Sequence, residues 1–479
     1  MKLRATRLVP LMFCALSFTH AQIAHFDHII VVFQENRTPD NLFQGLCAPP
    51  YGTSGSCSTR PTGAQYNIQT DNWLDNTSST GKTTPSTVAL ANAYDLYHIH
   101  SAFTAQCDLN TTTGKCRMDG AAGVKCTGTC PSKPQFKYVS NTDGSLNPYL
   151  SIATQYGWAN YMFQTNQGPS YPAHQYIFGG TAAPSAEDDA NGIFAMDNVH
   201  QSEPGNAVTG CTAYADGYVT LITPTSQNQN IYPCFEHQTL SDLLDSAGVS
   251  WKYYTPSATS LWTAPNSIQH ICMPSAPTAG TCTGDEWVNN VHIGPGRVLT
   301  DIANCSLTGV SWVIPDGKDS DHAQSNQGEG PSWVASIVNA VGNNPQCKSG
   351  ELYWNNTAIV ITWDDWGGWY DHEAPKILAG VQGDYQYGFR VPLIIVSAYT
   401  TPAYVNNNRL DFGSILRFIE HNFSITEGAL NFADARIQTD LRLFFNLKQA
   451  PRPFQTIAAP LDANYFINDK RPPTDPDTD

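Results

Sequence analysis

Near its N-terminus the chain reads His28-Ile29-Ile30-Val31-Val32-Phe33-Gln34-Glu35-Asn36-Arg37. The run His28–Phe33 is apolar and rich in β-branched residues without alternation, which predicts a strand buried on both faces. Polar residues follow it directly. Ligands of open α/β sheets bind at the carboxyl ends of the strands, so Glu35 and Asn36 lie where a site is expected.

Similar apolar runs recur along the chain. They predict further strands at Val310–Ile314, Ala358–Trp363 and Val391–Ser397, with a less apolar candidate at Val249–Tyr254. Apolar residues at helical spacing predict helices at Gln238–Ala247, Ser332–Val341 and Phe412–Phe423. This alternation indicates an α/β fold with a mostly parallel central sheet flanked by helices. Residues 44–90 and 180–235 are loop-rich insertions, and we expect residues 22–479 to form one catalytic domain.

The composition excludes several classes of protein. Of 479 residues, 41% are hydrophobic and only 14% are charged, and 11 Trp, 22 Tyr and 20 Phe require a large core, so the chain is not disordered. No repeat or heptad persists, which excludes collagen and coiled coils. The net charge of −16 argues against binding to nucleic acid or docking on an anionic bilayer.

Residues 1–21 resemble an export signal. Lys2, Arg4 and Arg7 precede the apolar run Leu8–Phe18, and Ala21 suits a cleavage site. The run is shorter than the roughly 20 residues of a spanning helix, so we expect no stable membrane insertion. The predicted location is therefore secreted or periplasmic.

The cysteines favour an oxidising compartment. Cys14 belongs to the signal, and the others are even in number. They suggest the pairs Cys47/Cys57, Cys107/Cys116, Cys126/Cys130, Cys211/Cys234, Cys272/Cys282 and Cys305/Cys347. A zinc site at Cys107, Cys116, Cys126 and Cys130 is the alternative. Its spacings differ from zinc knuckles, so we expect disulfides that pin the loop insertions.

Two predicted strands end in oxygen ligands. Glu35 and Asn36 follow the first, and Asp364 and Asp365 follow Ala358–Trp363. Converging carboxylates repel one another unless a cation lies between them, and oxygen ligands suit a divalent metal. The spacing alone leaves capping of turns and helices equally open.

Serine and histidine residues supply further candidates. Ser170 lies in Gly168-Pro169-Ser170-Tyr171-Pro172-Ala173-His174, a constrained turn from which a hydroxyl could attack phosphorus, although turn serines are common. His100, His174, His322 and His372 occur in polar, glycine-rich or acidic contexts and could bind metal or transfer protons. His98 alternates with His100, so only one of the two is expected to face a site.

Four stretches, in order, resemble the secreted phosphoesterase family of bacterial phospholipases C, plant non-specific relatives and bacterial acid phosphatases. They are residues 28–40, Gly168-Pro169-Ser170, residues 362–372 and Gly388-Phe389-Arg390-Val391-Pro392. The resemblance spans about residues 25–425. It implies an alkaline-phosphatase-like α/β fold and an active-site metal.

The resemblance also implies roles for individual residues. Glu35, Asn36, Asp364, Asp365 and the nucleophile Ser170 would hold one divalent ion, either Ca, Mg, Mn or Zn. The family histidines around the phosphate would correspond to His100, His322 and His372. This chain departs from the family in having Asp365 where Glu is frequent. It also has Ala173-His174 where many phospholipases have Asn-Arg, and we expect His100, His174 and His322 to contact substrate.

We therefore expect an acid-phosphatase-like phosphomonoesterase that forms a phosphoserine, with His322 or His372 protonating the departing alkoxide. A phospholipase C acting on phosphatidylcholine-type lipids is the alternative. It is less favoured because the haemolytic members carry extra C-terminal domains. A secreted carbohydrate-binding or adhesive protein, with Trp363–Trp369 stacking on sugars, is a third hypothesis. A sulfatase is weaker, since no Cys/Ser-x-Pro-x-Arg stretch occurs at Ser170.

Overall fold

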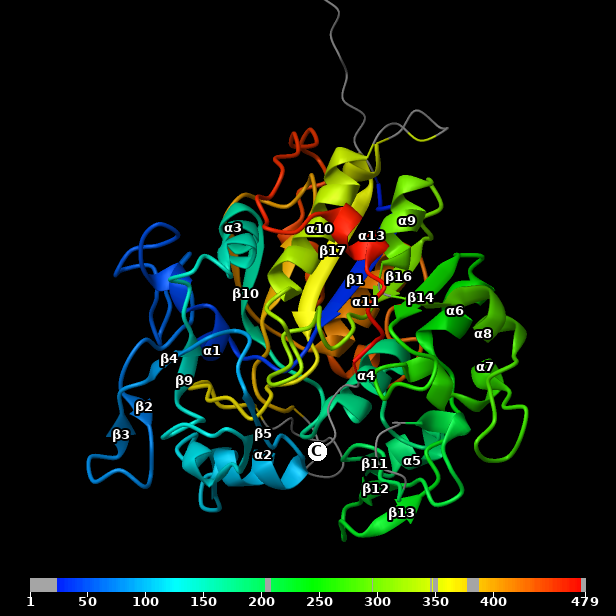
Figure 1. Cartoon of the computed structure of the whole chain (residues 1–479). Helices are drawn as coiled ribbons and strands as arrows, with labels where there is room; N and C mark the ends of the chain where they lie inside the picture. The colour runs from blue at the N-terminus through cyan, green and yellow to red at the C-terminus, as the bar shows by residue number, and fades with distance from the viewer. Residues whose placement is uncertain are drawn as a thin grey trace, which may run out of the picture.

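The computed structural model describes residues 24–202, 208–294, 296–344, 347, 352–376 and 387–474. An eight-stranded sheet lies at its centre (Figure 1). Across the sheet the order is β15 (Val291–Ile293), β14 (Trp251–Thr255), β16 (Val310–Val313), β1 (His28–Gln34), β17 (Thr357–Trp363), β18 (Leu393–Val396), β10 (Gly157–Met162) and β19 (Tyr404–Leu410). Only β18 runs antiparallel to its neighbours, so the expected mostly parallel sheet is confirmed.

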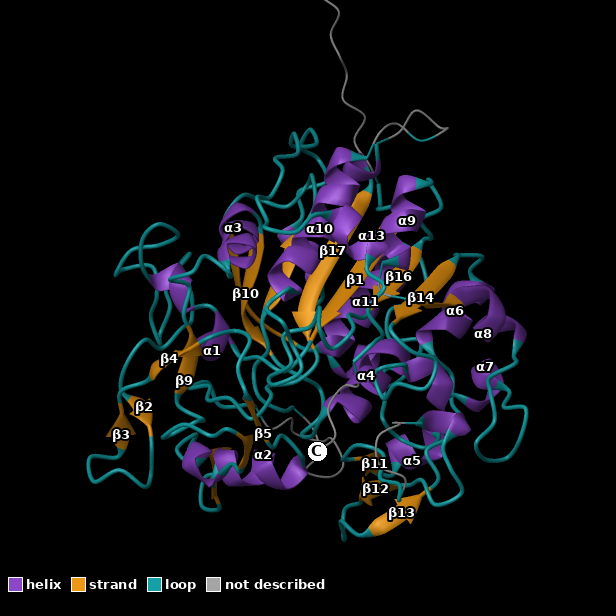
Figure 2. Cartoon of the chain, in the orientation of Figure 1, coloured by secondary structure: helices purple, strands orange, loops and turns teal. Residues whose placement is uncertain are grey.

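Helices cover the sheet on both sides (Figures 1 and 2). In the view of Figure 1, α10 (Gly330–Asn343), α3 (Asn147–Gln155), α9 (Arg297–Ala303) and α13 (Ala463–Asn468) lie in front of it. Behind it lies α11 (Phe412–Asn422), which packs against α4 (Ser170–Gly179), and α4 in turn packs against α6 (Leu240–Ser246). The predicted helices correspond to α6, α10 and α11.

Shorter elements complete the described chain. The helices are α1 (Pro39–Leu42), α2 (His100–Cys107), α5 (Ala186–Ala190), α7 (Gln269–Cys272), α8 (Asp285–Asn290) and α12 (Ala433–Arg436). The strands are β2 (Trp73–Leu74), β3 (Lys82–Thr83), β4 (Ser86–Val88), β5 (Tyr94–Leu96), β6 (Leu109–Asn110), β7 (Lys115–Cys116), β8 (Cys126–Gly128), β9 (Lys137–Val139), β11 (Phe194–Ala195), β12 (Val219–Ile222) and β13 (Gln229–Ile231). Both loop-rich insertions therefore contain only short elements.

The sequence missed three strands of the central sheet, β15, β10 and β19. The first has only three residues, Val291–Ile293. The sequences of β10 and β19, Gly-Trp-Ala-Asn-Tyr-Met and Tyr-Val-Asn-Asn-Asn-Arg-Leu, contain asparagines, which are depleted in strands. Asn160 in β10 is nevertheless buried, because its side-chain oxygen accepts a hydrogen bond from the Asn67 backbone and its amide donates to the Gln65 carbonyl. Tertiary contacts thus compensate for the weak local preference.

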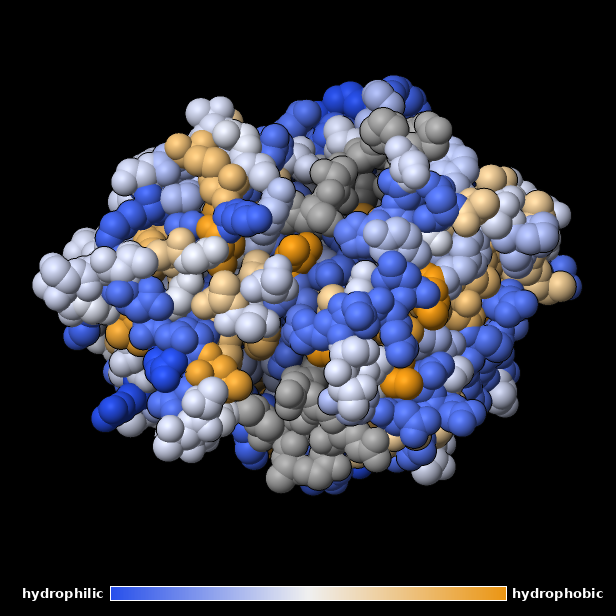
Figure 3. All heavy atoms as spheres, turned by 90° about the horizontal axis from the view of Figure 1, so that it is seen from below, coloured by the Kyte–Doolittle hydropathy of each residue, from blue (hydrophilic) through white to orange (hydrophobic). Residues whose placement is uncertain are grey.

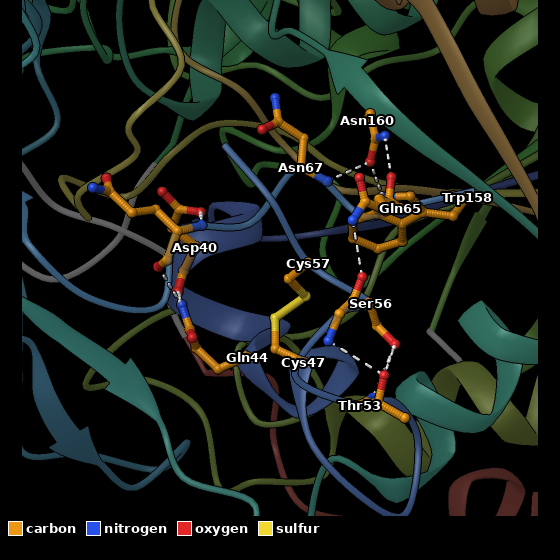
Figure 4. The surroundings of a disulfide bond; sticks show 12 residues. Asp40, Gln44, Cys47, Thr53, Ser56, Cys57, Gln65, Asn67, Trp158 and Asn160 are labelled. Carbon is orange, nitrogen blue, oxygen red and sulfur yellow. Dashed lines mark hydrogen bonds between the residues drawn. A yellow bond between two sulfur atoms is a disulfide. The ribbon is translucent and has the colours of Figure 1, made fainter. Parts of the chain in front are cut away.

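All six predicted disulfides are present, and the alternative zinc site is wrong because its four cysteines form two of them. Figure 4 shows Cys47–Cys57 in the first insertion, near Gln44 and Gln65. Through Gln65 and Asn67 the same insertion is hydrogen-bonded to β10. The disulfide thus shortens a loop that is also bonded to the central sheet.

In the described part of the chain, no helix has the length and apolar character needed to cross a bilayer. The predicted signal, residues 1–21, lies outside the described residues. One large hydrophobic cluster extends through the sheet and its covering helices, and two smaller clusters lie beside it. The single catalytic domain over residues 22–479 stays a prediction.

The strand directions bring five segments to one edge of the sheet. β14, β16, β1, β17 and β10 all run the same way, because β18 is antiparallel to both β17 and β10. Their carboxyl ends point down in Figure 2. The polar residues that follow these strands are therefore delivered to the same edge.

Asp321, which follows β16, is hydrogen-bonded to three other segments at this edge. Its Oδ2 accepts hydrogen bonds from the Tyr149 hydroxyl of α3 (2.8 Å) and from the indole of Trp363 at the end of β17 (2.9 Å). The Arg37 side chain donates to its backbone carbonyl. Burial raises the pKa of Asp321 to about 6.

The raised pKa of Asp321 predicts a pH-dependent stability. The folded state holds this proton more tightly than the unfolded state, so ionisation of Asp321 lowers the free energy of unfolding as pH rises from about 4 to about 6. Asp321→Asn removes this penalty. Urea titrations measure the free energy of unfolding at pH 4 and at pH 7. Between these pH values, the free energy of unfolding of the variant should rise by up to about 3 kcal/mol relative to that of wild type. A difference between Asp321→Asn and wild type that is the same at both pH values would contradict the prediction.

At Gly367, where the loops after β1 and β17 meet, there is no space for a side chain. Its φ is +60°, and a Cβ there would lie 2.4 Å from the Asn36 carbonyl oxygen. Gly63 has a φ of +59° with nothing within 4 Å of the same position, so it is a matched control for backbone strain alone. Gly367→Ala should lower the free energy of unfolding by about 1–3 kcal/mol more than Gly63→Ala. If urea denaturation shows the same loss of unfolding free energy for both variants, the close approach of the Asn36 carbonyl oxygen does not restrict residue 367.

Candidate active site

The acidic candidates converge at the centre of this edge. β1 and β17 are paired in register up to Gln34 and Trp363, so Glu35 and Asp364 follow side by side. The Asn36 backbone N–H donates to Asp364 Oδ1 (3.0 Å), and the Arg37 N–H donates to the Asp365 carbonyl (3.1 Å). All three carboxylates and the Asn36 amide are fully buried.

Ser170 reaches the acidic pair from β10. Its Oγ donates a hydrogen bond to Asp365 Oδ2 (3.3 Å), and the residue is fully buried. Gln164 and Asn166 hold the preceding turn, because both side-chain amides donate to the Gly168 carbonyl. Ser170 is the first residue of α4 and not part of an open turn, so its Oγ lies at the positive end of the helix dipole.

His174 lies one helical turn after Ser170, on the same face of α4. Its Nε2 is 3.3 Å from Glu35 Oε1 and 3.9 Å from Asp364 Oδ2. The ring stacks near Trp262 with centroids 6.4 Å apart. Burial lowers the pKa of His174 to about 4, so the imidazole is neutral at ordinary pH.

Asn36 is oriented by His98. Asn36 has a left-handed backbone (φ 63°), and its Nδ2 lies 3.1 Å from His98 Nε2. His98 Nδ1 is 2.8 Å from the Leu96 carbonyl, which can only accept, so we assign the ring proton to Nδ1 and make Nε2 the acceptor from Asn36. This bond leaves Asn36 Oδ1 on the other side of the amide.

His322 joins the same group through ring contacts. Its Nδ1 is 2.7 Å from the Ala323 carbonyl, and its ring lies 5.9 Å from that of His98 and 6.2 Å from Trp262. The sequence analysis missed Trp262, which lies between His174 and His322 in these contacts. Only its position after β14 could have pointed to it.

His100 lies close to the turn that precedes Ser170. It begins α2, and its Nδ1 is 2.8 Å from the carbonyl of Gln167, three residues before Ser170. Burial lowers the pKa of His100. The strand alternation expected for His98 and His100 does not apply here because the helix begins at His100, and both residues contact the site segments.

His372 is bonded elsewhere. Its Nδ1 is 2.6 Å from Asp40 Oδ2 and its Nε2 is 2.9 Å from Asn67 Oδ1. Beside it, Arg390 makes two hydrogen bonds to Asp371, of 2.8 and 2.9 Å. Although burial opposes ionisation of Asp40, His372 and Arg390 hold its pKa below the usual value. His372 thus belongs to a second buried charge group.

The residues around Glu35 fit a divalent metal. Ligand atoms of Glu35, His174 and Asp364 lie within 4.8 Å of one another. Among the described residues, nothing donates a hydrogen bond to Asn36 Oδ1 or Asp364 Oδ2, although both are buried. Carboxylate, amide and imidazole donors together suit such an ion. The capping hypothesis also holds in part, since Asp364 Oδ1 and Asp365 Oδ1 accept backbone N–H groups.

The chain is similar to characterised bacterial enzymes. It is 28% identical over 228 residues to the non-hemolytic phospholipase C of Burkholderia pseudomallei, covering 39% of this chain and 32% of that protein. It is 21% identical over 456 residues to phospholipase C A of Mycobacterium tuberculosis H37Rv, covering 90% of this chain and 79% of that protein. The chain therefore spans about a third of the first relative and most of the second.

Among solved structures, the chain is similar to a protein in the alkaline phosphatase superfamily from Vibrio parahaemolyticus. The identity is 9% and the TM-score is 0.31, over 58% of this chain and 60% of that one. The sequence model of the Phosphoesterase family matches residues 26–426, a range that holds the central sheet and every candidate residue of the site. The chain belongs to the Phosphoesterase family.

Proposed function

We propose that this protein is an exported, metal-dependent phosphoric ester hydrolase that acts on phosphomonoesters through a phosphoserine on Ser170. The observation that carries the proposal is the hydrogen bond between Ser170 Oγ and Asp365 beside the buried group Glu35, Asn36 and Asp364. Membership of the Phosphoesterase family supports the reaction class. Six disulfides support the oxidising compartment.

The hydroxyl of Ser170 is placed for attack on phosphorus. Asp365 Oδ2 accepts the hydrogen bond from Oγ and can take up its proton as the Oγ–P bond forms and the ester P–O bond breaks. The N-terminal end of α4 stabilises negative charge on the phosphoryl oxygens. A bound divalent ion would offset the charge of the phosphate and favour ionisation of the attacking hydroxyl. Water then hydrolyses the phosphoserine and releases phosphate.

Two histidines suit protonation of the departing alkoxide. Carbonyls bonded to Nδ1 of His322 and of His100 keep a proton on Nδ1, so Nε2 can protonate the alkoxide only after it has taken up a proton from solvent and the ring has become imidazolium. We favour His322, because its ring packs against His98, the residue that orients Asn36. His372 has both nitrogens bonded to Asp40 and Asn67, so we assign it to positioning the Asp40–Arg390 group instead.

Two observations bear on the competing substrates. Ser170 and Asp365 are fully buried, which favours a small phosphate ester over a lipid headgroup that stays in a bilayer. In Figure 3, which views the edge of the carboxyl ends from below, apolar described residues form small separate spots among hydrophilic ones. The relatives named phospholipase C make phospholipid cleavage the second candidate. Sugar stacking by Trp363, Trp366 and Trp369 is wrong, because all three are fully buried.

The nucleophile assignment predicts that Ser170→Ala loses at least about 10³-fold in kcat for p-nitrophenyl phosphate, because the phosphoserine cannot form. Acid quenching of the wild type during turnover should trap a phosphorylated Ser170 peptide, detected by mass spectrometry. Ser336→Ala removes another buried helical hydroxyl, which donates to the Trp333 carbonyl, and should retain activity. Activity of Ser170→Ala close to wild type would exclude Ser170 as the nucleophile.

The substrate assignment predicts a clear preference between two chromogenic esters. Wild-type protein should show at least about tenfold higher kcat/KM for p-nitrophenyl phosphate than for p-nitrophenyl phosphorylcholine, because full burial of Ser170 and Asp365 favours the smaller ester. Both assays read p-nitrophenol release under identical conditions. A preference for the phosphorylcholine ester, with diacylglycerol released from phosphatidylcholine vesicles, would favour the phospholipase C candidate instead.

A further inference from the structure

His174 is buried among metal-binding candidates without a hydrogen bond. Nothing in the described structure donates to or accepts from either of its ring nitrogens, although the side chain is fully buried. A buried polar group normally has a partner, because leaving it unsatisfied is costly. Its Nε2 is directed at Glu35 Oε1 (3.3 Å) and Asp364 Oδ2 (3.9 Å).

We propose that His174 is a nitrogen ligand of the active-site ion, and that it makes the site prefer a transition ion such as Mn²⁺, Co²⁺ or Zn²⁺ over Ca²⁺ or Mg²⁺. This inference rests on the metal centre of the proposed function. It replaces the expectation that His174 contacts substrate. His174 lies on helix α4, whereas the acidic candidates lie directly after strands β1 and β17.

The packing of α4 supports this role. Ser170 and His174 are four residues apart on one helical face, so the bond from Ser170 to Asp365 also sets His174 against Glu35 and Asp364. Trp262 (6.4 Å) and Phe33 (6.1 Å) lie near the imidazole ring and limit its reorientation. The ring is therefore held on the side of α4 that faces the acidic pair.

The distances argue against a simple ion pair. A charged histidine bonded to a carboxylate has a separation of about 2.7–2.9 Å, shorter than either contact here. His174 Nε2 lies 3.3 Å from Glu35 Oε1 and 3.9 Å from Asp364 Oδ2, and ligand atoms of the three residues lie within 4.8 Å of one another, so one ion could be shared among them. Calcium and magnesium prefer oxygen ligands, whereas imidazole suits transition ions.

Electron spin echo spectroscopy of the Mn²⁺-loaded full chain tests the proposal directly. The wild type should show ¹⁴N modulation from a bound imidazole, which changes to that of ¹⁵N when the protein is labelled with ¹⁵N-histidine. His174→Gln should lose the modulation, whereas His322→Gln, which removes another buried imidazole of the site, should keep it. Absence of modulation in the wild type, or its persistence in His174→Gln, would overturn the assignment.

Binding measurements test the selectivity. Isothermal titration should show the wild type binding Co²⁺ more tightly than Ca²⁺. His174→Gln should weaken Co²⁺ binding by about tenfold or more while changing Ca²⁺ binding little, because the amide supplies oxygen in place of nitrogen. Tighter binding of Ca²⁺ than of Co²⁺ by the wild type would refute the selectivity. Circular dichroism checks folding of the variant. If the variant misfolds, the wild-type ¹⁵N experiment still shows whether a histidine binds the ion, and His322→Gln shows whether that histidine is His322. Neither the spin echo spectrum nor the metal affinity depends on turnover. A failure of this metal-ligand assignment can therefore be distinguished from a failure of the proposed hydrolysis.

Discussion

The parallel pairing of β1 with β17 is the constraint on which the site depends. Seven residue pairs, from His28 with Thr357 to Gln34 with Trp363, bring the ends of both strands to the same level. A slip of one residue would turn the alternating side chains to the opposite face and separate Glu35 from Asp364. The buried, mostly β-branched run of β1 favours one register, because its neighbours pack against it on both sides.

Burying three carboxylates at one point is energetically unfavourable, and two kinds of contact offset this cost. Local backbone N–H groups bind one oxygen of Asp364 and one of Asp365. Their second oxygens are turned toward His174 and Ser170, respectively. The arrangement concentrates negative charge beside Ser170 in a chain of net charge −16, so the proposed phosphate substrate would have to be attracted by local and not by global charge. A cation bound at this point would offset both the carboxylate repulsion and the phosphate charge.

Most of the central strands and all six disulfides could be predicted, because each is marked by a strong local pattern in the sequence. The runs that became β1, β16 and β17 are short and apolar, so their place in a mostly parallel sheet was predicted correctly. The roles of the acids that follow β1 and β17 stay a prediction. The disulfides were predicted from close spacing and even number. The strands β10, β15 and β19 were missed. The first and last contain asparagines, whose hydrogen bonds include distant partners such as Asn67, and β15 has only three residues. His372 matches a family motif, yet hydrogen bonds place its ring beside Asp40.

The sequence by itself determined the α/β class, the cysteine pairs and the residue types available for chemistry, because periodicity and composition act over a few neighbouring residues. Only the tertiary structure decided which histidines meet which acids. His98 enters the site from the segment just before helix α2, His174 through a four-residue helical spacing in α4, and Trp262 from the loop after β14. These placements depend on contacts between segments more than sixty residues apart, such as Asn36 with His98. Local sequence preference carries no information about such contacts.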